Sequence, residues 1–193
     1  MNFEYPDSAT PLDPDEAAGL IPAHITNHQQ LNEWELQNIT AGERWAFARR
    51  GAGALDSAFI RALHKRMFGD TWRWAGTFRT SEKNIGVDPA RIAVALHELC
   101  ADVNAQLAHA SLPLDDIAVA YSHRLVAIHP FANGNGRLSR TAADLLLVQR
   151  GARRFTWGGN SLAPAGELRE RYIAALRDAD RHDYAALLAF ARS

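Results

Sequence analysis

Apolar residues recur at helical spacing along nearly the whole chain. After Asp88-Pro89, a typical helix start, they lie three or four positions apart, at Ile92, Leu96, Leu99, Val103 and Leu107. This period predicts an amphipathic helix. Similar patterns predict further helices at about 27–50 and around the apolar rows at 59–67, 117–128, 138–146, 168–179 and 187–190. We therefore expect an all-α fold of about seven to eight helices.

One stretch, residues 77–87, lacks the helical pattern. Its β-branched and aromatic residues flank a polar centre that runs from Thr80 to Asn84. This arrangement predicts a small β-hairpin. A plain surface loop is the alternative that the sequence leaves open.

The composition is ordinary for one globular domain, and we expect residues 1–193 to form a single unit. Residues 1–15 are acidic and contain three prolines, so we expect an irregular arm lying on the domain. The formal net charge of −1 gives no reason to expect a nucleic-acid partner. No apolar run reaches the roughly 18 residues of a membrane span. Cys100 is the single cysteine, which excludes an intrachain disulfide and fits a cytoplasmic protein.

The stretch from His129 to Arg140 gathers several chemically active groups within twelve residues. His129 is a candidate general base, because a histidine is partly neutral near physiological pH. A glycine-rich turn at 134–136 opens the next predicted helix, and such a turn offers free backbone N–H groups to an anion. Arg137 and Arg140 lie three residues apart, so both are expected to reach toward that turn. An ordinary helix corner with solvated arginines is the alternative.

This stretch, His129-Pro130-Phe131-Ala132-Asn133-Gly134-Asn135-Gly136-Arg137-Leu138-Ser139-Arg140, resembles the signature of the Fic family. The resemblance extends over roughly residues 13–160: residues 63–79 are similar to the segment that leads into the Fic flap. Residues 19–26 and 154–158 resemble a bacterial subgroup called mobile mystery protein B. The resemblance implies a Fic-type helical bundle with a small β-hairpin flap at 77–87. It also implies an enzyme, a nucleotidyltransferase that moves AMP from ATP to a Ser, Thr or Tyr hydroxyl of a target protein.

The resemblance also assigns roles to single residues. His129 is expected to be catalytic and to deprotonate the target hydroxyl, while Phe131 is structural. The expected nucleotide-binding residues are Gly134, Asn135 and Gly136 for the α- and β-phosphates, Arg137 for the β-phosphate and Arg140 for the γ-phosphate. The target protein is expected to dock along Thr77–Val87 as an added strand.

Asn133 departs from the family pattern, which has Asp or Glu as the Mg²⁺ ligand at this position. An asparagine oxygen is a neutral and weaker ligand for this hard cation. Three alternatives follow: Mg²⁺ is held by phosphates and water with Asn133 as a neutral aid, or catalysis is slow, or the donor is not ATP. The departure also supports a rival function, in which a degenerate Fic scaffold binds nucleotide or protein without transferring AMP.

Many Fic proteins carry an inhibitory motif, (Ser/Thr)-x-x-x-Glu-(Gly/Asn), whose Glu pairs with the last signature arginine. The chain shows no such motif: Ser161 lacks a Glu four residues on, and Thr40 has Arg44 there. We therefore expect either a separate antitoxin-like partner, with this chain as the toxin, or an enzyme slow enough to need no inhibitor.

Overall fold

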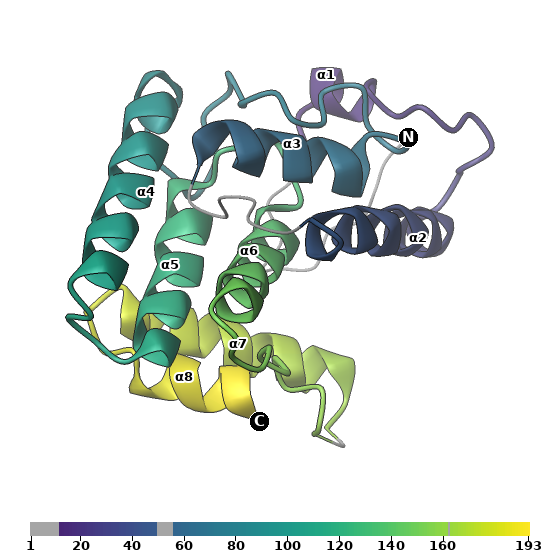
Figure 1. Ribbon diagram of the computed structural model, residues 1–193. Helices are drawn as coiled ribbons and strands as arrows, with labels where there is room; N and C mark the ends of the chain where they lie inside the picture. Colours follow the sequence, from purple (N-terminus) through teal and green to yellow (C-terminus); the bar gives the residue numbers. More distant parts are fainter. Residues whose placement is uncertain (1–11, 50–55, 162) are drawn as a thin grey trace.

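The computed structural model describes residues 12–49, 56–161 and 163–193. Within these ranges the chain forms eight α-helices and one short 3₁₀-helix (Figure 1). Their bounds are α1 Pro14–Ala17, α2 His28–Phe47, α3 Ser57–Phe68, η1 Pro89–Arg91, α4 Ile92–Ala108, α5 Leu114–Ile128, α6 Asn135–Gln149, α7 Ala165–Ala179 and α8 Ala185–Arg192. The all-α fold expected from the apolar spacing is confirmed.

Helices α5 and α6 form the centre of the bundle, where α4 packs beside α5 and the pair α2–α3 packs against the region of α6. Helices α7 and α8 pack against each other and lie across the lower end of α5 in Figure 1. Most apolar positions predicted from the spacing are buried, and on α6 these include Leu138, Ala142, Leu145 and Leu146. The chain thus brings the end of α5 and the start of α6 together at one end of the core.

Helices α2 and α3 and the 3₁₀-helix η1 each begin at a capping side chain. The Asp56 side chain accepts a hydrogen bond from the Ala58 N–H, and the Asp88 side chain accepts one from Ala90. Each cap satisfies a backbone donor that the helix leaves unpaired. At α2 the predicted start is also found, with Asn27 as the cap, but the helix ends at Phe47. The predicted end at Arg50 lies outside the described residues.

Segment 77–87 contains no strand, so the expected β-hairpin is not found in the structure. The only β-bridge among the described residues is an isolated antiparallel one between Leu20 and Trp72. The reason is the Arg79 side chain, which donates hydrogen bonds to the carbonyls of Ser81 and Val87. The Val87 carbonyl, on the second arm of the expected hairpin, is thereby taken from a cross-strand ladder. The plain-loop alternative describes this segment.

The described part of the N-terminal arm is not wholly irregular. Pro14–Ala17 form the one-turn helix α1, in which the Glu16 side chain accepts a hydrogen bond from the Asp13 N–H at 2.9 Å. The Trp74 indole donates to the Glu16 carbonyl at 2.9 Å, which fixes α1 beside the start of segment 77–87. Across the part of the chain that the structure describes, no helix is both long enough and apolar enough to cross a membrane.

Candidate active site

His129 ends α5 and begins the turn that leads to α6. Its backbone has φ +53°, a left-handed conformation, and its N–H still bonds to the Leu125 carbonyl at 3.4 Å. Left-handed backbone is uncommon for a residue with a Cβ and is found where tertiary structure enforces it. Pro130 follows and cannot continue the helix, so local chemistry ends α5 at this histidine.

The His129 imidazole is buried, and neither ring nitrogen has a hydrogen-bond partner among the described residues. Burial, followed by the positive charge of Arg79 and, more weakly, that of Lys83, lowers the pKa of His129 to about 4 against an opposing contact with the Val126 backbone. The ring is therefore neutral at pH 7, with a lone pair able to accept a proton. Unpartnered buried nitrogens are rare in structures and identify this residue as the candidate base.

The turn after His129 is braced from two sides. The buried Asn135 side chain accepts from the Phe131 N–H at 3.0 Å and donates to the Phe131 carbonyl at 2.7 Å. Phe131 is fully buried, which fits the structural role expected from the sequence. The Asn135 side chain is therefore occupied by the turn itself, and the residue can offer a ligand only its backbone N–H.

His64 is a second buried imidazole that sequence reasoning did not single out. It stacks on the Phe131 ring, with centroids 3.8 Å apart. Its Nδ1 accepts from the Gly76 N–H at 3.0 Å, so the proton must lie on Nε2, which donates to the Asn133 carbonyl at 3.0 Å. Burial lowers the pKa of His64 to about 3, so this neutral tautomer persists. His64 thus ties the turn to the start of segment 77–87.

The start of α6 forms an open backbone cradle. Gly134 is the N-cap, with φ +80°, and a Cβ there would lie 2.5 Å from the Phe68 ring. Residues 135–137 form the first turn, whose N–H groups have no acceptor within the helix. A Cβ on Gly136 would meet nothing within 4 Å, so open space lies next to these donors. Free amides beside open space at a helix N-terminus suit a phosphate group.

The two signature arginines have different partners, and their guanidinium groups lie over different aromatic rings. Arg137 donates to the Glu35 carboxylate at 2.6 Å and lies over the Phe68 ring. Arg140 instead lies over the Tyr172 ring, 5.2 Å from its centroid. Among the described residues Arg140 has no carboxylate within 4 Å.

Glu35 is a further residue that the sequence analysis missed. Its carboxylate is buried and accepts from the Trp72 indole at 2.7 Å as well as from Arg137. A signal existed, because Glu35 lies four residues after Leu31 and three before Asn38, and helical spacing places all three on one face. Leu31 and Asn38 are both buried. An acidic residue on an inner helix face requires a partner.

Asn133 does not form a metal site by itself. Its side-chain oxygen accepts from the next N–H, that of Gly134, at 2.6 Å. The described ranges contain no group of three His, Cys, Asp or Glu residues arranged to hold a metal ion. Since Mg²⁺ needs charged oxygen ligands, the residues present do not fit a resident ion. The phosphates of a bound nucleotide would have to supply the charge.

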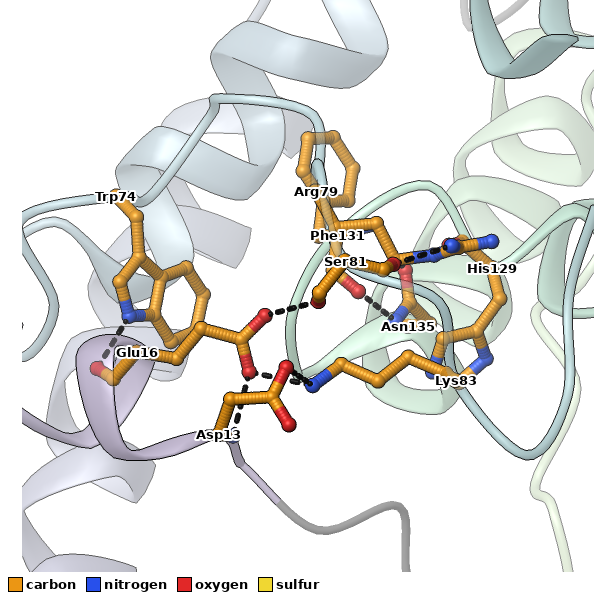
Figure 2. A network of polar contacts seen from close by, with 9 residues as sticks. All are labelled: Asp13, Glu16, Trp74, Arg79, Ser81, Lys83, His129, Phe131 and Asn135. Atoms are coloured by element: carbon orange, nitrogen blue, oxygen red, sulfur yellow. Dashed lines mark hydrogen bonds and ion pairs between the residues drawn. The ribbon is translucent and has the colours of Figure 1, made fainter. Parts of the chain in front are cut away.

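A polar network fixes segment 77–87 above this turn (Figure 2). The Lys83 ammonium pairs with Asp13 at 2.9 Å and with Glu16 at 2.5 Å, and its side chain is almost fully buried. The Ser81 hydroxyl also donates to Glu16, at 2.8 Å. Figure 2 shows the Lys83 side chain running beside the His129 ring. Helix α1 therefore holds the middle of the segment over the candidate base.

The chain matches proteins of known family over its central part. The profile of the Fic/DOC family matches residues 54–147. The protein adenylyltransferase fic-1 of Caenorhabditis briggsae is 28% identical over 141 residues, which cover 65% of this chain and 28% of that protein. A probable protein adenylyltransferase of Sinorhizobium fredii, y4lH, is 32% identical over 124 residues, covering 60% of this chain and 62% of the relative. The chain thus matches just over a quarter of the nematode protein's length.

Solved structures share the fold. The N-terminal Fic domain of a Bartonella quintana effector protein, solved with bound ADP, has a TM-score of 0.67 at 20% identity over 88% of this chain and 86% of that one. BepC of Bartonella tribocorum, solved with bound AMPPNP, has a TM-score of 0.68 at 17% identity over 93% and 97% of the two chains. Residues 54–147, which include the signature from His129 to Arg140, thus form a region that matches the Fic/DOC family and is related to the Fic protein adenylyltransferases.

Proposed function

We propose that the protein transfers AMP from ATP to a hydroxyl group of a target protein. The observation that carries this proposal is the junction of α5 and α6. There a buried, neutral His129 with unpartnered ring nitrogens adjoins an open helix N-terminus suited to phosphate. The relatives named as adenylyltransferases and the nucleotide-bound Bartonella structures support the same assignment.

The proposed reaction uses these residues as follows. His129 accepts the proton of a Ser, Thr or Tyr hydroxyl, and the oxygen of that hydroxyl attacks the α-phosphorus of ATP. The new oxygen–phosphorus bond forms as the bond to the β-phosphate oxygen breaks, so pyrophosphate leaves with its electron pair. The N–H groups of Asn135 and Gly136 hold the α- and β-phosphates, joined by that of Gly134 once it leaves the Asn133 side chain. Arg137 and Arg140 hold the β- and γ-phosphates. Such positioning and charge stabilisation account for most of the catalysis of phosphoryl chemistry.

Mg²⁺ would arrive with ATP rather than reside in the protein. Asn133 offers one neutral oxygen, already bonded to the Gly134 N–H. The proposed transferase therefore binds Mg²⁺ weakly, through phosphate oxygens and water, or it transfers AMP slowly.

The proposed target docks along Thr77–Val87, where Ile85 presents an exposed apolar side chain. In this structure the segment also covers His129, whose ring nitrogens are buried. Target docking thus requires the middle of the segment to move. Addition of an extended peptide as a strand to an exposed sheet edge is an established mode of peptide recognition, and in this proposal the segment becomes such an edge when the target binds.

Regulation by a separate antitoxin-like protein is the proposal that fits Arg140. No described carboxylate pairs with this arginine, whereas Glu35 pairs with Arg137. A partner could insert an acidic side chain at Arg140 and displace the γ-phosphate. Expression in a bacterial host tests this: growth arrest with the wild type and normal growth with His129→Ala support a toxin. Equal growth of both contradicts it.

The Glu35–Arg137 pair and Asn133 favour one rival, a nucleotide-binding module without transferase activity. Titration calorimetry with ATP, combined with a lysate incubated with ATP, separates the two. A transferase adds AMP to a hydroxyl of a lysate protein, detected as a mass increase, and His129→Ala abolishes this without abolishing ATP binding. Binding without any modified protein favours the module.

A further inference from the structure

Arg79 has an environment that a merely structural arginine does not need. Its guanidinium is buried, with 5% of the residue exposed, and no carboxylate among the described residues lies within 4 Å of it. Instead it donates to three backbone carbonyls, those of Ser81 at 2.8 Å, Val87 and His129 at 2.6 Å. The carboxylates of Glu16, Asp88 and Glu82 act on this charge from longer range. The backbone carbonyls supply the direct hydrogen bonds that a buried charge requires.

The three carbonyls come from three places that the site must hold together. Ser81 and Val87 lie on either side of Lys83 in segment 77–87, and His129 is the candidate base. Figure 2 shows Ser81, Arg79 and His129. A backbone hydrogen bond also joins the segment to the turn, because the Arg79 N–H donates to the Pro130 carbonyl at 3.0 Å. A planar guanidinium with donors in a fixed fork can make these bonds at once, whereas an ammonium cannot hold the same geometry.

Gly86 shows how closely the segment lies on the turn. Its φ is +110°, and a Cβ there would lie 2.6 Å from an Arg79 nitrogen and 2.8 Å from the His129 Cβ. The glycine therefore permits the contact between the guanidinium, the segment and the base. The charged groups that act on the His129 ring are Arg79 and Lys83, both from this segment.

We propose that Arg79 is a positioning residue for AMP transfer, which fixes both ends of the target-docking segment in register with His129. The effect of Arg79 on AMP transfer rests on the proposed function, whereas its hydrogen bonds to the segment and to His129 do not. Arg79 bonds to the backbone of the segment at Ser81 and Val87, whereas α1 contacts the side chains of Ser81 and Lys83. The side-chain contacts can therefore be released for target docking while the backbone stays fixed at Ser81 and Val87. A target that pairs with the segment is thereby placed at a fixed distance from the base.

The test uses the full chain with Arg79→Met and Arg79→Lys, and with Arg91→Met as a matched control on an exposed arginine just after the segment. We expect Arg79→Met to speed amide exchange at Val87 about tenfold and to raise the pKa of His129 in an NMR titration. It should lower kcat/KM for the target about a hundredfold while changing the KM for ATP less than about twofold. Arg79→Lys should retain the low pKa of His129 but still lose the protection of the Val87 amide from exchange.

Unchanged exchange and an unchanged His129 titration in Arg79→Met would overturn the proposal, as would the same changes in Arg91→Met. If Arg79→Met does not fold, the Val87 exchange in Arg79→Lys decides, and wild-type protection there contradicts the proposal. If the wild type transfers no AMP to any protein, the proposed function fails. The exchange and the titration then still decide the role of Arg79, because neither requires activity.

Discussion

His129 shows how one residue acquires chemistry from its surroundings. The end of α5, the left-handed backbone and the cover provided by segment 77–87 bury the ring without giving it a partner. Burial and two nearby cations then hold the imidazole neutral. A neutral ring with no bond of its own is ready to accept a proton and needs only a hydroxyl brought to it.

The pH dependence of transfer should reveal this environment. A histidine of ordinary pKa, near 6.5, would lose its basic form as the pH falls below neutrality. Because the pKa of His129 is lowered to about 4, the neutral form persists well below pH 6.5. We expect kcat/KM at pH 5.5 to stay within about twofold of its value at pH 7.5, with the acidic limb below about pH 5. If kcat/KM instead falls with a midpoint near pH 6.5, in a protein shown by circular dichroism to remain folded, the pKa of His129 is not lowered.

Asn133 offers a direct test of the metal account. Asn133→Asp keeps an oxygen that can accept from the Gly134 N–H and adds a negative charge for Mg²⁺. We expect a higher transfer rate and a half-saturating Mg²⁺ concentration about tenfold lower, measured by AMP transfer across a Mg²⁺ series. Asn133→Ala is the control and should not lower the Mg²⁺ requirement. A variant that gains nothing at any Mg²⁺ concentration would show that the missing charge does not limit the enzyme.

At the scale of elements, α2 controls one nucleotide-binding arginine through Glu35. The buried carboxylate holds Arg137 with an ion pair, which competes with a nucleotide phosphate for the same guanidinium. We expect Glu35→Gln to lower the Kd for ATP severalfold and to reduce the free energy of unfolding by about 1–3 kcal/mol. Calorimetry and chemical denaturation measure both effects, with the exposed Glu33→Gln on the same helix as control. Weaker ATP binding would show instead that Glu35 orients Arg137 for the phosphate.

Helix α1 acts on the segment above His129 through Lys83. Glu16→Gln removes a charge that pairs with the buried ammonium at 2.5 Å. Because Asp13 still pairs with Lys83, we expect a moderate loss of about 1–2 kcal/mol in the free energy of unfolding. Amide exchange at residues 81–83 should become several times faster, while Glu98→Gln, on an exposed face of α4, should leave it unchanged. Equal exchange in both variants would show that α1 does not restrain the segment.

Across the whole molecule, the sequence predicted those features that depend on hydrogen bonds between near neighbours in the chain. Asp56 and Asp88 cap helices through bonds to residues two positions on, so their pattern was sufficient. Segment 77–87 is a loop because of bonds from the Arg79 side chain, which residue types alone do not reveal. Glu35 and His64 gain their roles from α6 and from the turn that precedes it. Those partners lie tens of residues away along the chain, and only the packing of the bundle brings them together.

In the proposed function, the junction of α5 and α6 transfers AMP, with His129 as the base. The most direct measurement incubates the full chain and a bacterial lysate with ATP labelled either at the α-phosphate or at the γ-phosphate. We predict protein-bound label from the α-phosphate only, and none with His129→Ala. Label from the γ-phosphate, or equal labelling by the wild type and His129→Ala, would contradict the account.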